Sequence, residues 1–354
     1  MSDNREKIEL KFTKYQDALV LQQSDLSLKS IADMVEDGAI DISPKYQRRE
    51  RWDSKKESDL IESFLLNIPV PPIYLAEDEY GTYSVIDGKQ RLTAITNFLT
   101  GVLKLNNLER FKELEGFTFN ELPKALKNAL SIRPYLRVVT ILKQSDSELK
   151  HEVFLRLNKA GVALNSQEIR NVAFRGKFND MLFELASNEQ FSALLKSDDK
   201  KGKVYREMID VQFVLRFFTV KHTWDNFPGN MDMAMDSFMR DFYRSNDKEV
   251  ASYSEDFNRA LRSCIAIWGD KSFMKPNASR KVLQGFFDIQ MVCVSMLSDR
   301  QLNRAIAEKE QVKKRLEEEL DINEDFLKSV SQFTSNPKAV KYRIQHFLSV
   351  IKGI

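Results

Sequence analysis

Five consecutive residues of this chain combine two cations, an amide and a carboxylate. They are Asp87, Gly88, Lys89, Gln90 and Arg91. Arginine forms planar, paired contacts with phosphate oxygens, and lysine adds a point charge. The Gln90 amide could orient a water molecule, and the Asp87 carboxylate could hold Mg²⁺ or accept a proton from that water. These residue types therefore point to binding and hydrolysis of a nucleoside triphosphate, which needs cations around its phosphates and a water held in line.

The same residues also have a purely structural interpretation. Asp87 could be only the capping residue of a helix, and Gly88 could supply only a turn with positive φ. Lys89 and Arg91 could be solvated side chains. The five residues alone leave both interpretations open.

The surrounding periodicity predicts that these residues form the turn between a strand and a helix. A short β-branched run, 85–86, precedes them. Apolar residues then recur with helical spacing, and Gly101 supplies a stop. A helix start offers unpaired backbone N–H groups and positive potential, both of which suit phosphate.

A second candidate segment, 45–56, lies upstream. It carries six basic residues against two acidic ones, and Gln47 and Arg48 lie within it. Such a patch can hold phosphate, although a run of charges can equally be a solvated surface. We expect Trp52 to anchor the segment and Arg48 to share one pocket with Arg91, so that a single triphosphate touches both.

The order of these segments resembles the N-terminal domain family of GmrSD-type modification-dependent restriction enzymes, which has a ParB/sulfiredoxin-like fold. The family pattern runs roughly Pro-x-aromatic-Gln-Arg-x-x-x-Trp, a helix, Pro-x-Pro-Pro before a strand, and then Asp-Gly-Gln-Gln-Arg. The matching residues are Pro44, Tyr46, Gln47, Arg48, Trp52, Pro69, Pro71, Pro72, Asp87, Gly88, Gln90 and Arg91. Blocks at 156–171 and 206–210 also look like later family blocks, so the resemblance covers roughly residues 25–220.

The resemblance implies that a nucleotide binds and is hydrolysed at this turn. The implied catalytic residues are Asp87, Gln90 and Arg91, and the implied nucleotide-binding residues are Gln47, Arg48, Gly88, Lys89, Arg91 and Asn158. Lys89 stands where the family usually has glutamine, which adds a charge, removes an acceptor and puts in question any role that needs the amide. Asn158 could instead shape a helix end before Gly161, and Glu168 could be part of a capping box that opens the next helix.

The sequence predicts an α+β protein with three parts. Residues 1–24 form an extension, 25–145 a ParB/sulfiredoxin-like nucleotide-binding domain, and 146–354 an all-helical domain. Strands are expected at 40–42, 73–76, 82–86 and 135–142, and helices at 30–36 and 54–66. After Ser147 helices are expected near 148–159, 177–187, 205–220, 231–243, 254–268, 279–297, 299–319 and 337–352.

Composition favours an ordinary cytoplasmic protein. The formal net charge is +2, so the overall charge does not by itself indicate nucleic-acid binding. No apolar run approaches the roughly 20 residues that a membrane span needs. Cys264 and Cys293 lie in apolar helical surroundings, as reduced core cysteines do.

Histidine usage argues against a nuclease centre in the helical half. The chain has three histidines, His151, His222 and His346, and none has metal-ligand spacing with a cysteine or another histidine. GmrSD-type enzymes often carry a C-terminal His-Asn-His nuclease, and nothing after Ser147 supplies its clustered histidines. We expect any DNA cleavage to belong to a partner chain.

The leading hypothesis is therefore a DNA-associated protein of a prokaryotic restriction or anti-phage defence system that hydrolyses a nucleoside triphosphate with Mg²⁺. Its expected partners are the nucleotide, DNA and a nuclease or other defence subunit, and a homodimer is left open. One alternative is a non-enzymatic switch that binds nucleotide or DNA in the same place. Another is a metal-dependent nuclease that uses Asp87.

Overall fold

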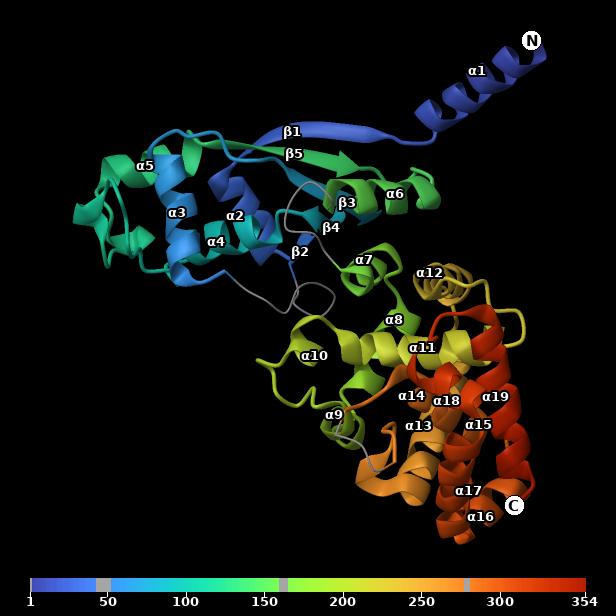
Figure 1. The fold of residues 1–354 in the computed structure, drawn as a ribbon. Coiled ribbons are helices and arrows are strands. Elements are labelled where there is room, and N and C mark those ends of the chain that lie inside the picture. Colours follow the sequence, from blue (N-terminus) through green and yellow to red (C-terminus); the bar gives the residue numbers. More distant parts are fainter. Residues whose placement is uncertain (1, 43–51, 159–164, 277–280) are drawn as a thin grey trace. The chain divides into compact units, whose positions relative to one another are not determined.

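The computed structural model describes residues 2–42, 52–158, 165–276 and 281–354 (Figure 1). The chain divides into two compact units, Met1–Asn165 and Ser166–Ile354. The first unit holds a five-stranded mixed sheet and the second is mostly helical, which confirms the α+β class. Helix α6 (Ser147–Asn158) groups with the first unit. The finer limits 1–24, 25–145 and 146–354 stay predictions.

The sheet of the first unit has the order β1-β5-β3-β4-β2. Its strands are β1 (Leu21–Ser27), β2 (Ile40–Asp41), β3 (Ile73–Glu79), β4 (Thr82–Asp87) and β5 (Tyr135–Ile141). The pairs β1–β5 and β3–β4 are antiparallel, whereas β3–β5 and β2–β4 are parallel. Four of the strands match the sequence prediction. The periodicity missed β1, because this edge strand is mostly exposed and has few apolar residues.

Helices of the first unit share one apolar core with the sheet. They are α2 (Leu28–Glu36), α3 (Ser54–Leu65), α4 (Lys89–Leu99) and α5 (Lys124–Ile132). Helix α1 (Ser2–Asp17) is exposed from residue 5 onward and contributes no residue to this core. Both α2 and α3 pack against α4 (Figure 1). Buried Ile31, Phe64 and Ile95 of these helices belong to the same core cluster as Ile73 and Val85 of the sheet. This packing fixes where α4 begins, and therefore where the turn 87–91 lies.

A buried carboxylate holds the loop that follows α4. Glu62 of α3 is 5% exposed and accepts the backbone N–H groups of Glu109 at 3.1 Å, Arg110 at 2.7 Å and Phe111 at 2.9 Å. Desolvation by burial raises the pKa of Glu62, but the three hydrogen bonds outweigh it and bring the pKa below its usual value. The charged form of Glu62 is therefore the form that the fold requires.

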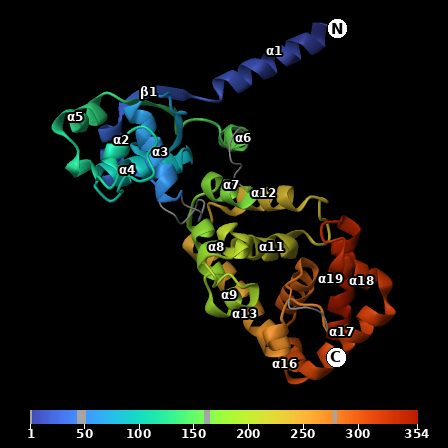
Figure 2. The same ribbon diagram turned by 60° about the vertical axis from the view of Figure 1, so that its left-hand side comes forward.

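The second unit is built from short and medium helices (Figure 2). They are α7 (Ser166–Ala173), α8 (Lys177–Ala186), α9 (Glu189–Leu195), α10 (Lys203–Arg206), α11 (Ile209–Thr223), α12 (Met231–Phe242), α13 (Asp247–Trp268), α14 (Gln284–Phe287), α15 (Cys293–Ser295), α16 (Asp299–Ala307), α17 (Lys309–Ile322), α18 (Glu324–Ser331) and α19 (Pro337–Lys352). A π-helical turn, Asp288–Val292, joins α14 to α15. The central helix α11 packs against α8 and α12, and its phenylalanines are buried. In the described part of the chain, no helix is both long and apolar enough to cross a membrane.

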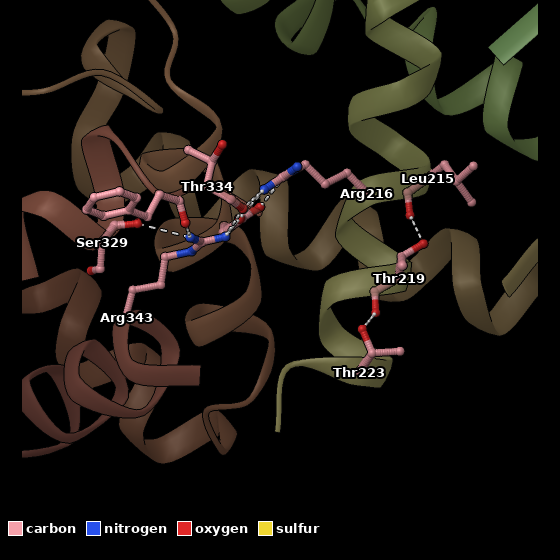
Figure 3. A network of polar contacts seen from close by, with 9 residues as sticks. Leu215, Arg216, Thr219, Thr223, Ser329, Thr334 and Arg343 are labelled. Carbon is pink, nitrogen blue, oxygen red and sulfur yellow. Dashed lines mark hydrogen bonds and ion pairs between the residues drawn. The ribbon is translucent and has the colours of Figure 1, made fainter. Parts of the chain in front are cut away.

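An ionic network crosses the core of this unit. The fully buried Asp288 receives two hydrogen bonds from Arg216 of α11, at 2.7 and 2.8 Å, and also pairs with Arg343 of α19. Both guanidinium groups donate to the carbonyl oxygen of Thr334, at 3.1 and 2.9 Å. Figure 3 shows the two arginine side chains converging from separate helices. The network thus ties α11, the π-helical turn and α19 together.

Glu62 gives the first unit a pH-dependent contribution to stability. Replacing Glu62 with Gln should lower the free energy of unfolding by about 2 kcal/mol at pH 7, because the negative charge is lost and an NH2 group replaces one of the two oxygens that accept backbone N–H groups. Because the pKa of Glu62 is lower in the folded protein than in the unfolded chain, where it is about 4.5, the ionised carboxylate stabilises the fold at pH values above 4.5. This stabilisation is lost as the pH falls through the pKa of the folded state. Urea unfolding should therefore show a difference in unfolding free energy between wild type and Glu62→Gln that becomes smaller at acidic pH. The exposed Glu115, changed to Gln, is the control and should give no gap at any pH.

The Asp288 network should dominate the stability of the second unit. Asp288→Asn leaves two buried guanidinium groups without their counter-charge and should destabilise by about 3–5 kcal/mol. Asp299 offers a matched control, since it pairs with Arg259 at 2.7 Å but its side chain is 89% exposed. Asp299→Asn should cost less than about 1 kcal/mol. Thermal or urea unfolding of both variants measures the difference, and equal losses would contradict the network's importance.

Candidate functional site

The turn 87–91 joins β4 to α4, as the periodicity predicts. Asp87 is the last residue of β4, Lys89 is the first residue of α4, and Gly88 between them is the N-terminal cap. Gly88 has φ 100° and ψ 12°, in the left-handed region, and a Cβ there would collide with Cδ1 of Ile73. The cap makes no side-chain hydrogen bond. Asp87 is therefore not the capping residue of α4, which corrects one structural alternative considered from the sequence.

The carboxylate of Asp87 is held by Arg91. Nη2 of Arg91 donates to Oδ2 of Asp87 at 2.8 Å and to the carbonyl oxygen of Pro72 at 3.1 Å. The Arg91 side chain is 15% exposed, whereas that of Asp87 is 45% exposed. Nε of Arg91 is buried and has no hydrogen-bond partner among the described residues. A largely buried guanidinium thus orients a carboxylate that solvent and ligands can reach.

The side chain of Gln90 bonds within the protein. Its Oε1 accepts the backbone N–H of Trp52 at 3.1 Å. Trp52 is half-buried and packs against the core of the first unit, so it anchors the chain as expected. Gln90 and Arg91 therefore fix the turn to two other family-like blocks, one ending at Trp52 and one ending at Pro72. Lys89, beside them, is partly exposed.

The side chains of three sequence-predicted site residues lie outside the described part of the chain. Gln47 and Arg48 lie outside the described residues, so their shared pocket with Arg91 stays a prediction. Asn158 is the last residue of α6, but its side chain lies outside the described part. Its role at the nucleotide site stays a prediction as well.

The later family-like block around Arg170 is buried in the second unit. Arg170 is fully buried and pairs with Asp232 at 2.5 Å and with Asp236 at 2.6 Å, both on α12. Asn171 is also fully buried, and its amide donates to the sulfur of Met208 at 3.0 Å. Met208 belongs to the block 206–210 and has a left-handed backbone, φ 56°. These two blocks therefore pack α7 against α12 and the start of α11.

The described residues contain no group of three or more His, Cys, Asp or Glu side chains that could hold a metal ion by themselves. A magnesium ion that accompanies a triphosphate needs only one or two carboxylates, since phosphate oxygens and waters complete its shell. The half-exposed Asp87 fits that limited role. Of the described histidines, His346 pairs with Glu319 at 2.7 Å and lies in the helical unit.

Residues 29–175 match the family model described as the GmrSD restriction endonuclease, N-terminal domain. The match includes the turn 87–91 and ends two residues after α7, and it confirms the resemblance inferred from the sequence for this part of the chain. Residues 29–175 are thus similar to a GmrSD-type N-terminal domain, and this match suggests a restriction- or defence-related system. Comparisons with curated proteins and with solved structures gave no match.

The close approach at Gly88 should make this glycine costly to replace. Gly88→Ala combines a left-handed backbone with a collision against Ile73, and should destabilise by about 3 kcal/mol. Gly116 is the matched control, because its φ is 82° but an added Cβ would meet nothing within 4 Å. Gly116→Ala should cost only about 1 kcal/mol of backbone strain. Equal unfolding free energies for the two variants would contradict the close approach.

Proposed function

We propose that this chain binds and hydrolyses a nucleoside triphosphate at the start of α4, as part of a restriction or anti-phage defence system. The observation that carries the proposal is the half-exposed Asp87 carboxylate, held by Arg91 beside a helix start whose cap has no side chain. A helix start favours phosphate groups, and a positioned carboxylate can accept a proton from water or bind Mg²⁺. The family match over residues 29–175 supports the restriction context.

The residues of the turn 87–91 have different roles in this proposal. Asp87 is the catalytic residue, because it is the carboxylate that reaches solvent. Arg91 acts through Asp87 and Gln90 acts through Trp52, so both are positioning residues in this proposal. Lys89 adds positive charge near the phosphates. When bound, Mg²⁺ would neutralise charge on the phosphate oxygens, with Asp87 as its protein ligand.

Further ligands and partners of this site are proposed from the family resemblance. Gln47 and Arg48 would contact the phosphates, and Asn158 would line the nucleotide site. DNA is the proposed macromolecular partner, and a separate nuclease or defence subunit would perform any cleavage. Purified protein should accordingly leave plasmid DNA intact in Mg²⁺.

The carboxylate of Asp87 should be required for turnover but not for binding. Asp87→Asn keeps the side-chain shape and removes the proton acceptor, so phosphate release should fall at least about 100-fold. The assay compares ATP, GTP, CTP and UTP with and without duplex DNA, alongside nucleotide binding to the same preparations. Wild-type turnover by a folded Asp87→Asn protein would eliminate the catalytic role. Nucleotide binding by the wild type without any turnover would favour a switch instead.

A second variant separates positioning from phosphate binding at Arg91. Lysine keeps the charge, but its side chain is shorter and lacks the planar guanidinium whose Nη2 reaches both Asp87 and the Pro72 carbonyl oxygen. If Arg91 positions Asp87, Arg91→Lys should lower kcat and leave KM nearly unchanged, whereas loss of a phosphate ligand would raise KM. Asp33→Asn breaks an exposed pair of the same i,i+4 spacing, with Lys29, and is the control that should leave both constants unchanged.

A further inference from the structure

One hollow of the second unit is lined by three lysines and a single acidic residue. It has a volume of about 590 Å³ and lies between α9, the end of α13 and the segment 269–275. Its charged lining residues are Lys196, Lys271, Lys275 and Asp270. The lining therefore carries a net positive charge, and a concave surface of one sign raises the local concentration of anions.

The three lysines of this hollow have no counter-charge within the described part of the chain. None of their Nζ atoms forms an ion pair there, and Asp270 does not pair with them. Lysines at two other hollows of the same unit are compensated. Lys221 pairs with Asp256 at 2.6 Å, and Lys313 pairs with Glu310 at 2.7 Å. Three uncompensated cations around one concave surface indicate an anion from outside the fold.

Helix capping does not account for these lysines. Lys196 is the C-terminal cap residue of α9 and Lys271 lies just beyond α13, where a cation can donate to the last carbonyl groups of a helix. Neither Nζ atom donates such a hydrogen bond to a described residue. Lys150 of the first unit, by contrast, donates to the carbonyl oxygen of Lys143 at 3.1 Å. The ammonium groups at the hollow are therefore accessible to a ligand.

Packing fixes the two sides of the hollow. Phe191 of α9 lies against Phe257 of α13, with 5.3 Å between ring centroids, and Figure 2 shows the two helices side by side. Phe191 also contacts Phe273, at 6.4 Å. Phe273 lies within 271–275 and has φ 67°, which is rare for a bulky residue, and its N–H donates to Oε1 of Gln290 at 2.6 Å. The segment that carries two of the lysines thus has a fixed path.

We propose that this hollow binds phosphate groups. Three cations against one acid suit a multiply charged anion better than a single carboxylate, and lysine binds phosphate as a point charge. Two sources share this chemistry, the backbone of DNA and a free polyphosphate. The site is separate from the turn 87–91. For its DNA source it rests on the proposed function, whereas a free polyphosphate would bind without DNA.

Variants that remove equal charge test the hollow. The hollow variant combines Lys196→Gln, Lys271→Gln and Lys275→Gln. The control variant removes the same charge from exposed lysines outside the lining, by Lys309→Gln, Lys338→Gln and Lys341→Gln. Fluorescence anisotropy follows binding of a labelled DNA duplex to the full-length proteins, and calorimetry follows binding of inorganic pyrophosphate. Phosphate release from nucleoside triphosphates is measured on the same preparations.

The hollow variant should lose on the order of 100-fold in DNA affinity at about 0.1 M salt, and its dependence of log affinity on log salt should flatten by about three units of slope. The control variant should stay close to wild type. A loss of pyrophosphate affinity confined to the hollow variant, with DNA affinity intact, would identify a free polyphosphate as the source. If the hollow variant does not fold, Lys271→Gln alone replaces it and should lose about tenfold.

Three results would overturn the proposal: equal losses in the two triple variants, no loss in either, or no binding of DNA or pyrophosphate by the wild type. Triphosphate turnover separates this failure from failure of the proposed function. A wild type that hydrolyses a triphosphate but binds neither probe at the hollow refutes the phosphate site alone. A wild type without turnover, whose DNA or pyrophosphate binding still depends on the three lysines, refutes the hydrolysis alone.

Discussion

The contact of Arg91 with Asp87 and Pro72 is the constraint on which the candidate site depends. It joins the end of β4, the first turn of α4 and the chain just before β3. An exposed i,i+4 ion pair contributes only about 0.3–0.5 kcal/mol to stability, so the attraction between Arg91 and Asp87 is not what makes this contact important. It matters because the guanidinium is largely buried and needs acceptors, and because those acceptors are fixed by the sheet. The orientation of Asp87 is thus a consequence of packing.

The second unit uses buried arginines in the same way, with different partners. Arg216 and Arg343 share Asp288, whereas Arg170 alone takes both Asp232 and Asp236. Each of these contacts connects elements far apart in the sequence. The planar, forked donor geometry of arginine suits such joints, since one side chain can serve a carboxylate and a carbonyl oxygen together. Burial lowers the pKa of Arg343 while Asp288 opposes this shift, so the network is a compromise between desolvation and pairing.

Local pattern was sufficient to predict the strand–turn–helix at 85–99, because β-branched residues, glycine and helical spacing all agree there. Local pattern was insufficient where a contact with a residue distant in the sequence determines the conformation or the hydrogen bonding. The sequence suggested that the Gln90 amide orients a water molecule. In the fold, the Gln90 side chain accepts a hydrogen bond from the backbone N–H of Trp52, 38 positions away. The helix expected at 205–220 breaks at Met208, whose left-handed backbone is rare outside Gly, Asn and Asp. Its contact with Asn171 has no local signal in the sequence.

The buried block around Arg170 helps to define the C-terminal limit of the folded domain that contains the family-like segment. The family match continues to residue 175, but α7 groups with the second unit, from Ser166 onward. A chain that stopped at 175 would keep Arg170 and Asn171 while losing Asp232, Asp236 and Met208, which satisfy them. The same truncation would remove α11 and α12, against which α7 packs, so this helix would lose its packing together with its buried ion pairs. The matched segment therefore depends for its last helix on residues that lie beyond it, and the helical unit supplies part of the environment that these family-like blocks need.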